Sequence, residues 1–142
     1  MRKLFWGGIH PEGHKDLSRG AAPVPAPLPA QVVLPMLQHI GAACTPVVKV
    51  GDQVRLGQKI GDGEGVCAPI HASVSGKVVA VEPRPHPNGQ DVLSVVIEND
   101  YMDTPDDTLK PHLTHKDLSA EEILRIVRDA GIVGMGGATF PT

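Results

Sequence analysis

Short apolar runs separated by turn-forming residues make up the middle of the chain, at 31–35, 45–50, 77–83 and 91–97. The last two runs are the longer ones and are rich in valine. Between them stands the pair Asn88-Gly89, and an Asn-Gly pair between apolar strands favours a β-hairpin. The pattern therefore predicts a mainly β unit in which these two runs form a hairpin.

One helix is predicted near residues 120–130. Ser119 and Glu122 have the spacing of a capping box, in which each residue satisfies an unpaired backbone N–H of the other. Leu118 and Ile123 occupy the positions of a hydrophobic staple. The apolar residues that recur at helical spacing along one face are Ile123, Ile126, Val127 and Ala130. Gly131 follows as a left-handed stop signal.

These elements suggest a division of the chain into four parts. The parts are an irregular, proline-rich segment at 1–29, a β domain at 30–100, an acidic and polar linker at 101–117, and the start of an α/β domain at 118–142. Alternating prolines before residue 30 exclude helix and favour an extended backbone. Five of the ten residues at 98–107 are acidic, which indicates a solvated connection.

Composition narrows the classes of function. With 16 Gly, 14 Pro and only 3% aromatic residues, the chain favours many short strands around an aliphatic core. The net charge is −3, and no part of the sequence resembles the basic face that phosphate backbones require, so direct nucleic-acid binding is not expected. No segment approaches the ~20 apolar residues that a membrane-spanning helix requires. Any membrane association is therefore expected to pass through partner subunits.

The potential metal ligands show no recognisable pattern. Cys44 and Cys67 lie far apart in the sequence, and we interpret them as small buried hydrophobic residues rather than as a disulfide or a metal pair. The histidine pairs close enough to share a metal are His10 with His14 and His112 with His115. They lack a convergent set of further ligands and are interpreted as surface residues. His39 and His71 are expected to be hydrogen-bonded core or rim residues, so no metal site and no catalytic residue are predicted.

Two stretches resemble the halves of a biotinyl/lipoyl-type barrel-sandwich hybrid. The first, at 47–60, has Gly51-Asp52 and Gly57-Gln58 at strand ends, where glycine tolerates a positive φ. The second, at 68–79, reads APIHASVSGKVV. The resemblance covers about residues 45–83 and implies a barrel-sandwich hybrid fold.

The segment that joins the two half-barrel stretches lacks the feature expected of a swinging-arm carrier domain. Carriers of this superfamily hold their cofactor on a lysine at the tip of the hairpin between the two halves. Residues 61–67 contain no lysine here, and Lys59 and Lys77 flank the hairpin. We therefore interpret the module as a structural or docking barrel, with a lipoyl/biotinyl carrier domain as the alternative.

The chain ends in the string GMGGATFPT at 134–142. Taken alone, its closely spaced glycines fit an ordinary tight turn or an anion-binding loop. The longer string resembles the GRGGAGFPT signature of the flavoprotein subunit of respiratory complex I, whose loop cradles FMN. The opening FWGGIHP at 5–11 is similar to the start of the C subunit of Rnf-type electron transport complexes. Opening, barrel and glycine loop follow in the same order, so the chain resembles the RnfC/RsxC family throughout.

This resemblance implies an electron-input role in a membrane-associated, ion-translocating NADH:ferredoxin oxidoreductase. The intact protein would bind FMN and NADH and hold two [4Fe–4S] clusters, as a peripheral subunit on the cytoplasmic side of the membrane and in contact with other subunits. The residues implied to line the flavin phosphate or ribityl group are Gly134, Gly136, Gly137, Ala138 and Thr139. Met135 replaces an arginine of the complex I signature, and Thr139 replaces a glycine.

Most of that chemistry is expected to lie beyond residue 142. The cysteine runs that [4Fe–4S] clusters require are absent, so we expect no cluster in this chain. Most of the flavin pocket would also be missing, so the segment is expected to be inactive alone. The A subunit of the sodium-translocating NADH:quinone oxidoreductase, a cobalamin reductase and an efflux adaptor barrel remain as alternatives.

Overall fold

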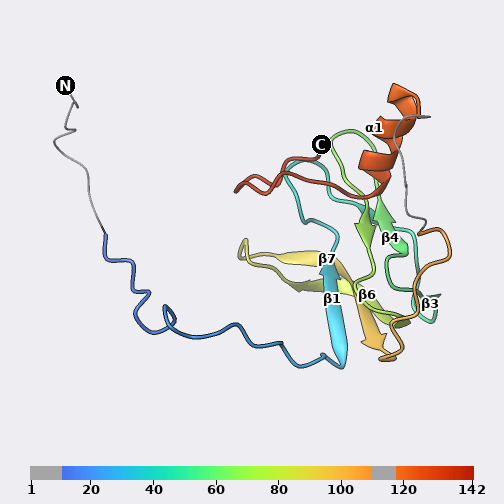
Figure 1. Cartoon of the computed structure of the whole chain (residues 1–142). Helices are drawn as coiled ribbons and strands as arrows, with labels where there is room; N and C mark the ends of the chain where they lie inside the picture. The colour runs from blue at the N-terminus through green and yellow to red at the C-terminus, as the bar shows by residue number, and fades with distance from the viewer. Residues whose placement is uncertain (1–10, 110–117) are drawn as a thin grey trace, which may run out of the picture.

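The computed structural model describes residues 11–109 and 118–142. Its first sheet has the strand order β1 (Gln31–Pro35), β7 (Asp91–Asn99), β6 (Gly76–Pro85), β3 (Gln53–Val54). A second sheet has the order β2 (Thr45–Pro46), β4 (Lys59–Asp62), β5 (Ile70–His71). All these pairs are antiparallel, which confirms the prediction of a mainly β unit. Residues 11–30 are exposed and lead away from the sheets (Figure 1).

The predicted hairpin is confirmed and is longer than the apolar runs suggested. β6 and β7 pair along their whole length, with a register shift between Val78 and Ala80. At the turn, the N–H of Gly89 donates to the carbonyl of His86 at 2.9 Å, and Gly89 has φ +85°. The left-handed residue of the Asn-Gly pair is therefore the glycine, which adopts this conformation without steric cost.

Both sheets contribute to one hydrophobic core. Its buried members are Met36, Cys44, Val54, Ile60, Cys67, Ile70, Ala72, Val74, Val78, Val95 and Ile97. This cluster contains no aromatic side chain, as the composition predicted. Met36, Cys44 and Cys67 add three sulfur-containing side chains to the otherwise aliphatic cluster.

Gly76 shows how tightly the backbones approach in the first sheet. It has φ +151°, and a Cβ atom there would lie 1.9 Å from the backbone oxygen of Glu98 on β7. Only glycine fits at this position.

The apolar run at 45–50 forms less strand than the pattern predicted. Only Thr45–Pro46 belongs to β2, and the chain then turns. The carboxylate of Asp52 accepts from the N–H of Lys49 at 2.9 Å, and the N–H of Asp52 donates back to the carbonyl of Lys49 at 3.1 Å. These local hydrogen bonds compete with strand pairing, so the prediction of a strand to residue 50 is wrong.

The acidic segment is exposed but is held against the barrel. The N–H of Leu56 donates to Thr104 O and the N–H of Asp106 donates to Leu56 O, each at 2.9 Å. The N–H of Thr104 also donates to the hydroxyl of Ser75 at 3.0 Å, and Arg55 pairs with Asp107. We expected a freely solvated linker in this segment. Residues 104–107 instead form hydrogen bonds to the barrel, because the backbone next to β3 offers unpaired N–H and C=O groups.

Helix α1 (Ala120–Asp129) matches the predicted helix. Ser119 and Glu122 form the capping box, with the Ser119 N–H donating to Glu122 Oε2 at 2.8 Å and the Glu122 N–H donating to Ser119 Oγ at 3.2 Å. Gly131 follows with φ +68°. No residue of α1 is buried, so its apolar face is only partly covered. The helix stands beside β4, at the same end of the molecule as the C-terminus (Figure 1).

Candidate functional site

The five residues implied by the flavin resemblance lie together in one exposed loop. Val133 bridges to Pro141, and the N–H of Gly134 donates to Phe140 O at 2.8 Å. Between these strand-like ends, the Thr139 N–H donates to Gly136 O at 3.1 Å. The segment therefore closes on itself as a narrow loop with Gly136 and Gly137 at the tip, and we call residues 133–141 the glycine loop.

The tip of the glycine loop is open to a ligand. Cβ atoms added at Gly136 or Gly137 would meet no atom within 4 Å, and Met135 is fully exposed. Within the described parts of the chain, the N–H groups of residues 135–138 donate to no backbone oxygen. Free N–H groups without side chains in front of them suit an anionic group such as a flavin phosphate.

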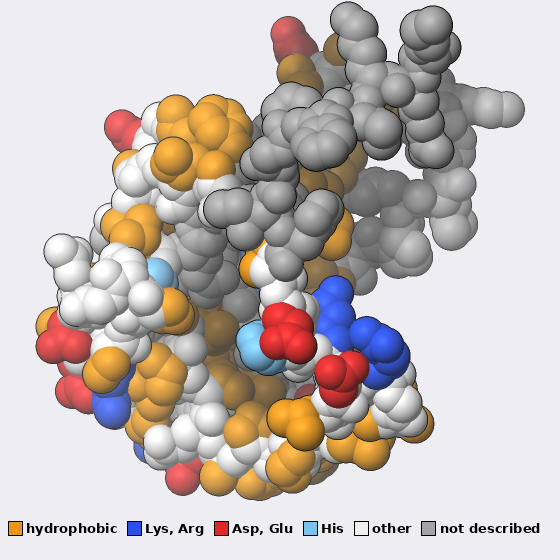
Figure 2. Space-filling model, turned by 90° about the vertical axis from the view of Figure 1, so that its left-hand side faces the viewer, with side chains coloured by type: hydrophobic (Ala, Val, Ile, Leu, Met, Phe, Trp, Pro, Cys, Tyr) orange, Lys and Arg blue, Asp and Glu red, His pale blue; other side chains and the backbone are white. Residues whose placement is uncertain are grey.

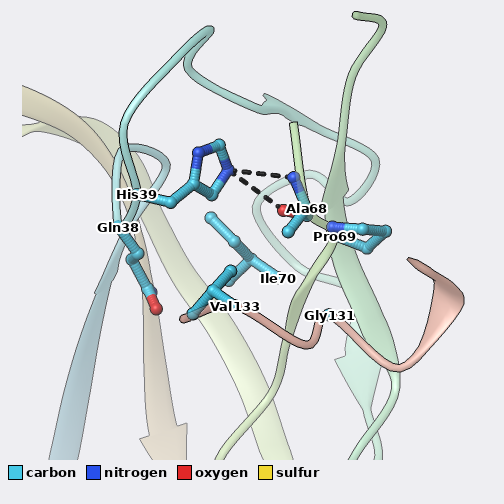
Figure 3. A pocket seen from close by; sticks show the side chains of 7 residues that line it. All are labelled: Gln38, His39, Ala68, Pro69, Ile70, Gly131 and Val133. Atoms are coloured by element: carbon cyan, nitrogen blue, oxygen red, sulfur yellow. Dashed lines mark hydrogen bonds between the residues drawn. The ribbon is translucent and has the colours of Figure 1, made fainter. Parts of the chain in front are cut away.

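The remainder of a flavin is not enclosed by the described residues. A pocket of about 60 Å³ lies beside the loop, lined by Gln38, His39, Ala68, Pro69, Ile70, Gly131 and Val133 (Figure 3). Ligand pockets usually measure about 300–1,000 Å³, so this one is too small for an isoalloxazine ring. None of the five implied residues lines it. The loop thus fits the phosphate end of FMN, and walls for the ring are not present in this part of the chain.

Thr139 has an unusual backbone conformation, with φ +44°. A β-branched residue in the left-handed region is strained, whereas glycine is not. The complex I signature has glycine at this position. The replacement of that glycine by Thr139 therefore falls at a position whose backbone conformation favours glycine.

The glycine loop is attached to the barrel through backbone contacts. The N–H of Ile40 donates to Ala138 O at 3.2 Å. At the other end of the segment, a Cβ atom on Gly131 would lie 2.5 Å from Pro69 O and 3.3 Å from the His71 ring. Gly131 therefore both ends α1 and lets the chain pass close to the strand edge at β5.

Four charged residues join α1 to the barrel, and we call them the charge clamp. Arg128 Nη2 donates to Asp62 Oδ1 and to Gly63 O, each at 2.9 Å. Lys59 Nζ lies 3.1 Å from Asp62 Oδ2 and 3.2 Å from Asp129 Oδ1. Two charges from β4 and two from the end of α1 thus alternate in sign. Figure 2 shows acidic and basic side chains gathered beside a histidine on one face of the molecule.

Lys59, Asp62 and Arg128 of the charge clamp are ionised at neutral pH, because the pKa values of the two bases are raised and that of the acid is lowered. Burial acts to raise the pKa of Asp62, but hydrogen bonds from the Gly63 N–H, Lys59 and Arg128 outweigh it, and the pKa lies below its ordinary value. Next to the clamp, burial and the charge of Lys59 lower the pKa of His71. His71 is therefore neutral at pH 7 beside the ion pairs.

In the ranges that it describes, the structure does not place a lysine where a lipoyl or biotinyl carrier domain would need one. The tip of the β4–β5 connection is exposed at Glu64–Val66, and its sequence contains no amine side chain. Lys59 is held in the charge clamp. A swinging cofactor arm needs a free lysine at an exposed tip, and the described tip of this connection offers none.

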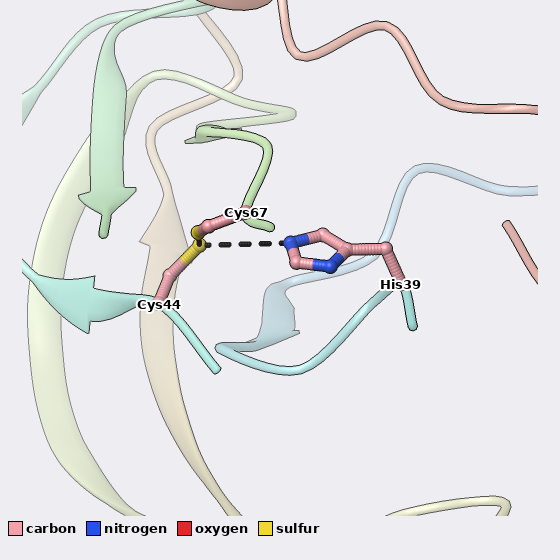
Figure 4. Close-up of side chains that lie close together, drawn as sticks. All are labelled: His39, Cys44 and Cys67. Atoms are coloured by element: carbon pink, nitrogen blue, oxygen red, sulfur yellow. Dashed lines mark hydrogen bonds between the residues drawn. The ribbon is translucent and has the colours of Figure 1, made fainter. Parts of the chain in front are cut away.

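The structure also brings together three side chains that sequence reasoning kept apart. Cys44 and Cys67 are both buried, as expected, and their Sγ atoms lie 3.0 Å apart. His39 Nε2 lies 3.9 Å from Cys44 Sγ (Figure 4). Spacing alone gives no signal for this cluster. The proximity of the cysteines follows from strand order instead. Cys44 precedes β2 and Cys67 precedes β5, and both of these strands pair with β4.

Other sequence features lie outside the described residues. They are the opening motif up to His10 and the histidines His112 and His115. His14 is exposed, and His39 is hydrogen bonded in the core as expected. Among the described residues, no helix has the length and apolar character needed to cross a bilayer.

Comparison with known proteins gives concordant matches. The model of the RnfC barrel sandwich hybrid domain matches residues 3–102. The chain is 54% identical over 142 residues to the C subunit of the Na(+)-translocating ferredoxin:NAD(+) oxidoreductase complex of Acetobacterium woodii, covering 97% of this chain and 31% of that protein. It is 45% identical to the C subunit of the proton-translocating ferredoxin:NAD(+) oxidoreductase complex of Clostridium ljungdahlii, with 99% and 31% covered.

A third relative is the C subunit of the ion-translocating oxidoreductase complex of Rhodobacter capsulatus, at 45% identity over 139 residues, with 96% of this chain and 27% of that protein covered. The chain thus spans about a third of the length of the relatives it matches. The match to the family model covers all seven strands of the described residues and confirms the barrel-sandwich fold predicted from the two half-barrel stretches. By the family match and by its similarity to these proteins, the chain belongs to the RnfC barrel sandwich hybrid family.

Proposed function

We propose that this chain is the N-terminal part of the C subunit of an Rnf-type, ion-translocating ferredoxin:NAD oxidoreductase. Similarity along 97% of the chain to the C subunit of such a complex supports this assignment. The intact protein would receive electrons at the cytoplasmic face of the membrane, as a peripheral member of the complex. The barrel would contribute no redox group and would position the domain that does.

The observation on which this role rests is the contact between the barrel and the segment 120–142. The charge clamp fixes the end of α1 on β4, and the glycine loop is bonded to the barrel at Ile40. A barrel that served only neighbouring subunits would not need these contacts to its own chain. The barrel would therefore act as a base for the α/β domain that begins at α1.

The glycine loop would hold the phosphate or ribityl end of FMN, through the N–H groups of Gly136, Gly137 and Ala138. Bound FMN would supply the hydride-accepting chemistry, with NADH and two [4Fe–4S] clusters bound by the remainder of the protein. This chain's own part would be to present unobstructed N–H donors at a fixed distance from the barrel. The Thr139 hydroxyl would add one further donor.

The proposal can be tested in the full-length protein that contains this segment. Replacing Gly136 and Gly137 by valine places side chains where the structure leaves open space, so the fold should tolerate the change. We expect FMN affinity to fall at least about tenfold, equivalent to ~1.4 kcal/mol. Gly20→Val, in an exposed segment with open space around it, is the matched control.

Flavin content per polypeptide and NADH-dependent reduction would be measured for both variants. If the double variant kept its flavin and its activity, the glycine loop would be an ordinary turn with no role in flavin binding. Loss of flavin in the Gly20→Val control would show that the effect is not specific to the loop.

A further inference from the structure

His39, Cys44 and Cys67 form a buried cluster of soft and borderline metal ligands. Their ligand atoms all lie within 4.8 Å of one another. The Sγ atoms are 3.0 Å apart, and His39 Nε2 is 3.9 Å from Cys44 Sγ. The three side chains come from the loop after β1, from the residue before β2 and from the β4–β5 connection. Figure 4 shows the imidazole edge facing the two sulfurs.

The histidine is oriented for ligation by its second nitrogen. His39 Nδ1 lies 3.0 Å from Ile40 O, an acceptor that places the ring proton on Nδ1. Nε2 then accepts from the N–H of Ala68 at 3.1 Å and lies 3.9 Å from Cys44 Sγ. A backbone carbonyl bonded to the other ring nitrogen is the usual support of a metal-bound histidine. A bound ion would replace the Ala68 N–H as partner of Nε2.

A fourth oxygen completes the arrangement. Ala68 O lies 3.2 Å from Cys44 Sγ, 3.2 Å from His39 Nε2 and 3.9 Å from Cys67 Sγ. In a tetrahedral zinc site, bonds of about 2.3 Å to sulfur and about 2.0 Å to nitrogen or oxygen separate the ligand atoms by roughly 3.3–3.8 Å. The separations here bracket these values, so small side-chain rotations would centre an ion among the four atoms.

We propose that His39, Cys44 and Cys67 bind one divalent cation of the zinc class, with the Ala68 carbonyl at the fourth position. This site is independent of the flavin assignment. It would tie the loop after β1 to the β4–β5 connection, next to Asp62 at the end of β4 and Gly63 in the connection, which both hold Arg128. The ion would thus brace the barrel edge on which α1 is clamped.

The proton balance of binding follows from the burial of the thiols. Burial, together with the neighbouring Cys67, raises the pKa of Cys44 to about 12, with opposing influences from Asp62 and Arg128. Without metal, Cys44 is therefore a thiol at pH 7. Binding would convert one M²⁺ and two S–H groups into two metal–sulfur bonds and two released protons. The two thiolates would neutralise the ion, so the buried site would carry no net charge.

Cobalt substitution provides a direct test with the chain itself. The purified chain, kept reduced and anaerobic, would be titrated with Co²⁺ and then with Zn²⁺. We expect one Co²⁺ per chain, a thiolate-to-cobalt charge-transfer band and the intense visible bands of a tetrahedral site, all removed by Zn²⁺. Because the thiols must lose protons to bind the ion, the apparent affinity should fall as the pH is lowered.

Variants identify the ligands. Cys44→Ser and Cys67→Ser should each abolish the charge-transfer spectrum, whereas His14→Gln, at an exposed histidine, should leave it intact. Zn²⁺ should also slow the reaction of both thiols with a thiol reagent in the unaltered chain, which requires no variant to fold. Absence of thiolate–cobalt bands, or their persistence in both cysteine variants, would overturn the proposal. So would purified chain that lacks two hydrogen masses and takes up no cobalt, because the pair would then be a disulfide.

Discussion

Two single residues near the end of the chain, Gly131 and Thr139, have left-handed backbone conformations. Both have positive φ angles, but only the first is a glycine. Gly131 also needs its lack of a side chain, because Pro69 O occupies the position of a Cβ atom. Close approach and backbone conformation therefore coincide at this residue.

Gly131→Ala should destabilise the attachment of the C-terminal segment by about 1–3 kcal/mol, from a left-handed alanine and the contact with Pro69. Native-state hydrogen exchange of the amides at 132–140 would report the loss as faster exchange. Gly136→Ala is the matched control, since a Cβ atom there meets open space. Equal protection in the two variants would contradict the close approach at Gly131.

Thr139→Gly should leave stability unchanged or raise it by up to about 1 kcal/mol. Removing the cost of a left-handed non-glycine residue, about 1–2 kcal/mol, outweighs the extra chain entropy of glycine, about 0.5–1 kcal/mol. Urea unfolding of the two chains would measure the difference. A loss above 1 kcal/mol would mean that the threonine side chain makes a stabilising contact.

At the scale of elements, α1 is specified locally and positioned by charge. Its capping box lies within four residues of sequence, whereas the clamp joins residues more than 60 positions apart. None of its residues is buried, so apolar packing fixes the helix only weakly. The ion pairs of Arg128 and Lys59 are therefore the main restraint on its orientation.

Arg128→Ala should weaken the attachment of α1 by about 1 kcal/mol, the range for a partly exposed charged pair with good geometry. The expected readout is faster hydrogen exchange in α1, with the strands β6 and β7 unchanged. Arg125→Ala, at an exposed arginine on the same helix, is the control. If both variants exchange alike, the clamp does not orient the helix.

At the scale of the whole molecule, acidification should loosen the contact between barrel and helix. The pKa of His71 is lowered in the fold from an ordinary value of 6.5, mainly by burial, so the unfolded chain binds more protons than the folded one below that pH. This contribution to stability is complete above pH 6.5 and is lost as the pH falls below it. The pKa of Asp62 is also lowered, from 3.8, so a second loss of stability follows in more acidic solution.

The measurement is the urea midpoint as a function of pH, for the unaltered chain and for His71→Gln. The variant should show a flatter profile between pH 6.5 and about pH 5, because it removes the titrating group. A variant profile as steep as the original would assign the effect to other histidines.

The amino-acid sequence determined the features that depend on neighbours along the chain. The capping box, the glycine stop after α1 and the Asn-Gly hairpin are all local hydrogen-bond or φ preferences, and the structure has each of them. The half-barrel stretches likewise specified the fold, because their turn residues fix where strands end. The run at 45–50 was misjudged for a local reason too, since the side chain of Asp52 favours a turn.

Only the tertiary structure decided which distant residues meet. Strand pairing and the return of the chain over β4 bring Asp62 close to Arg128, and they likewise bring Cys44 and Cys67 close to His39. No spacing in the sequence encodes those distances. The flavin assignment of the glycine loop stays a prediction, because a loop supplies donors while the walls of a pocket come from packing. Caps and turns depend on residues close together in the sequence, whereas a binding site depends on which distant segments the folded chain brings into contact.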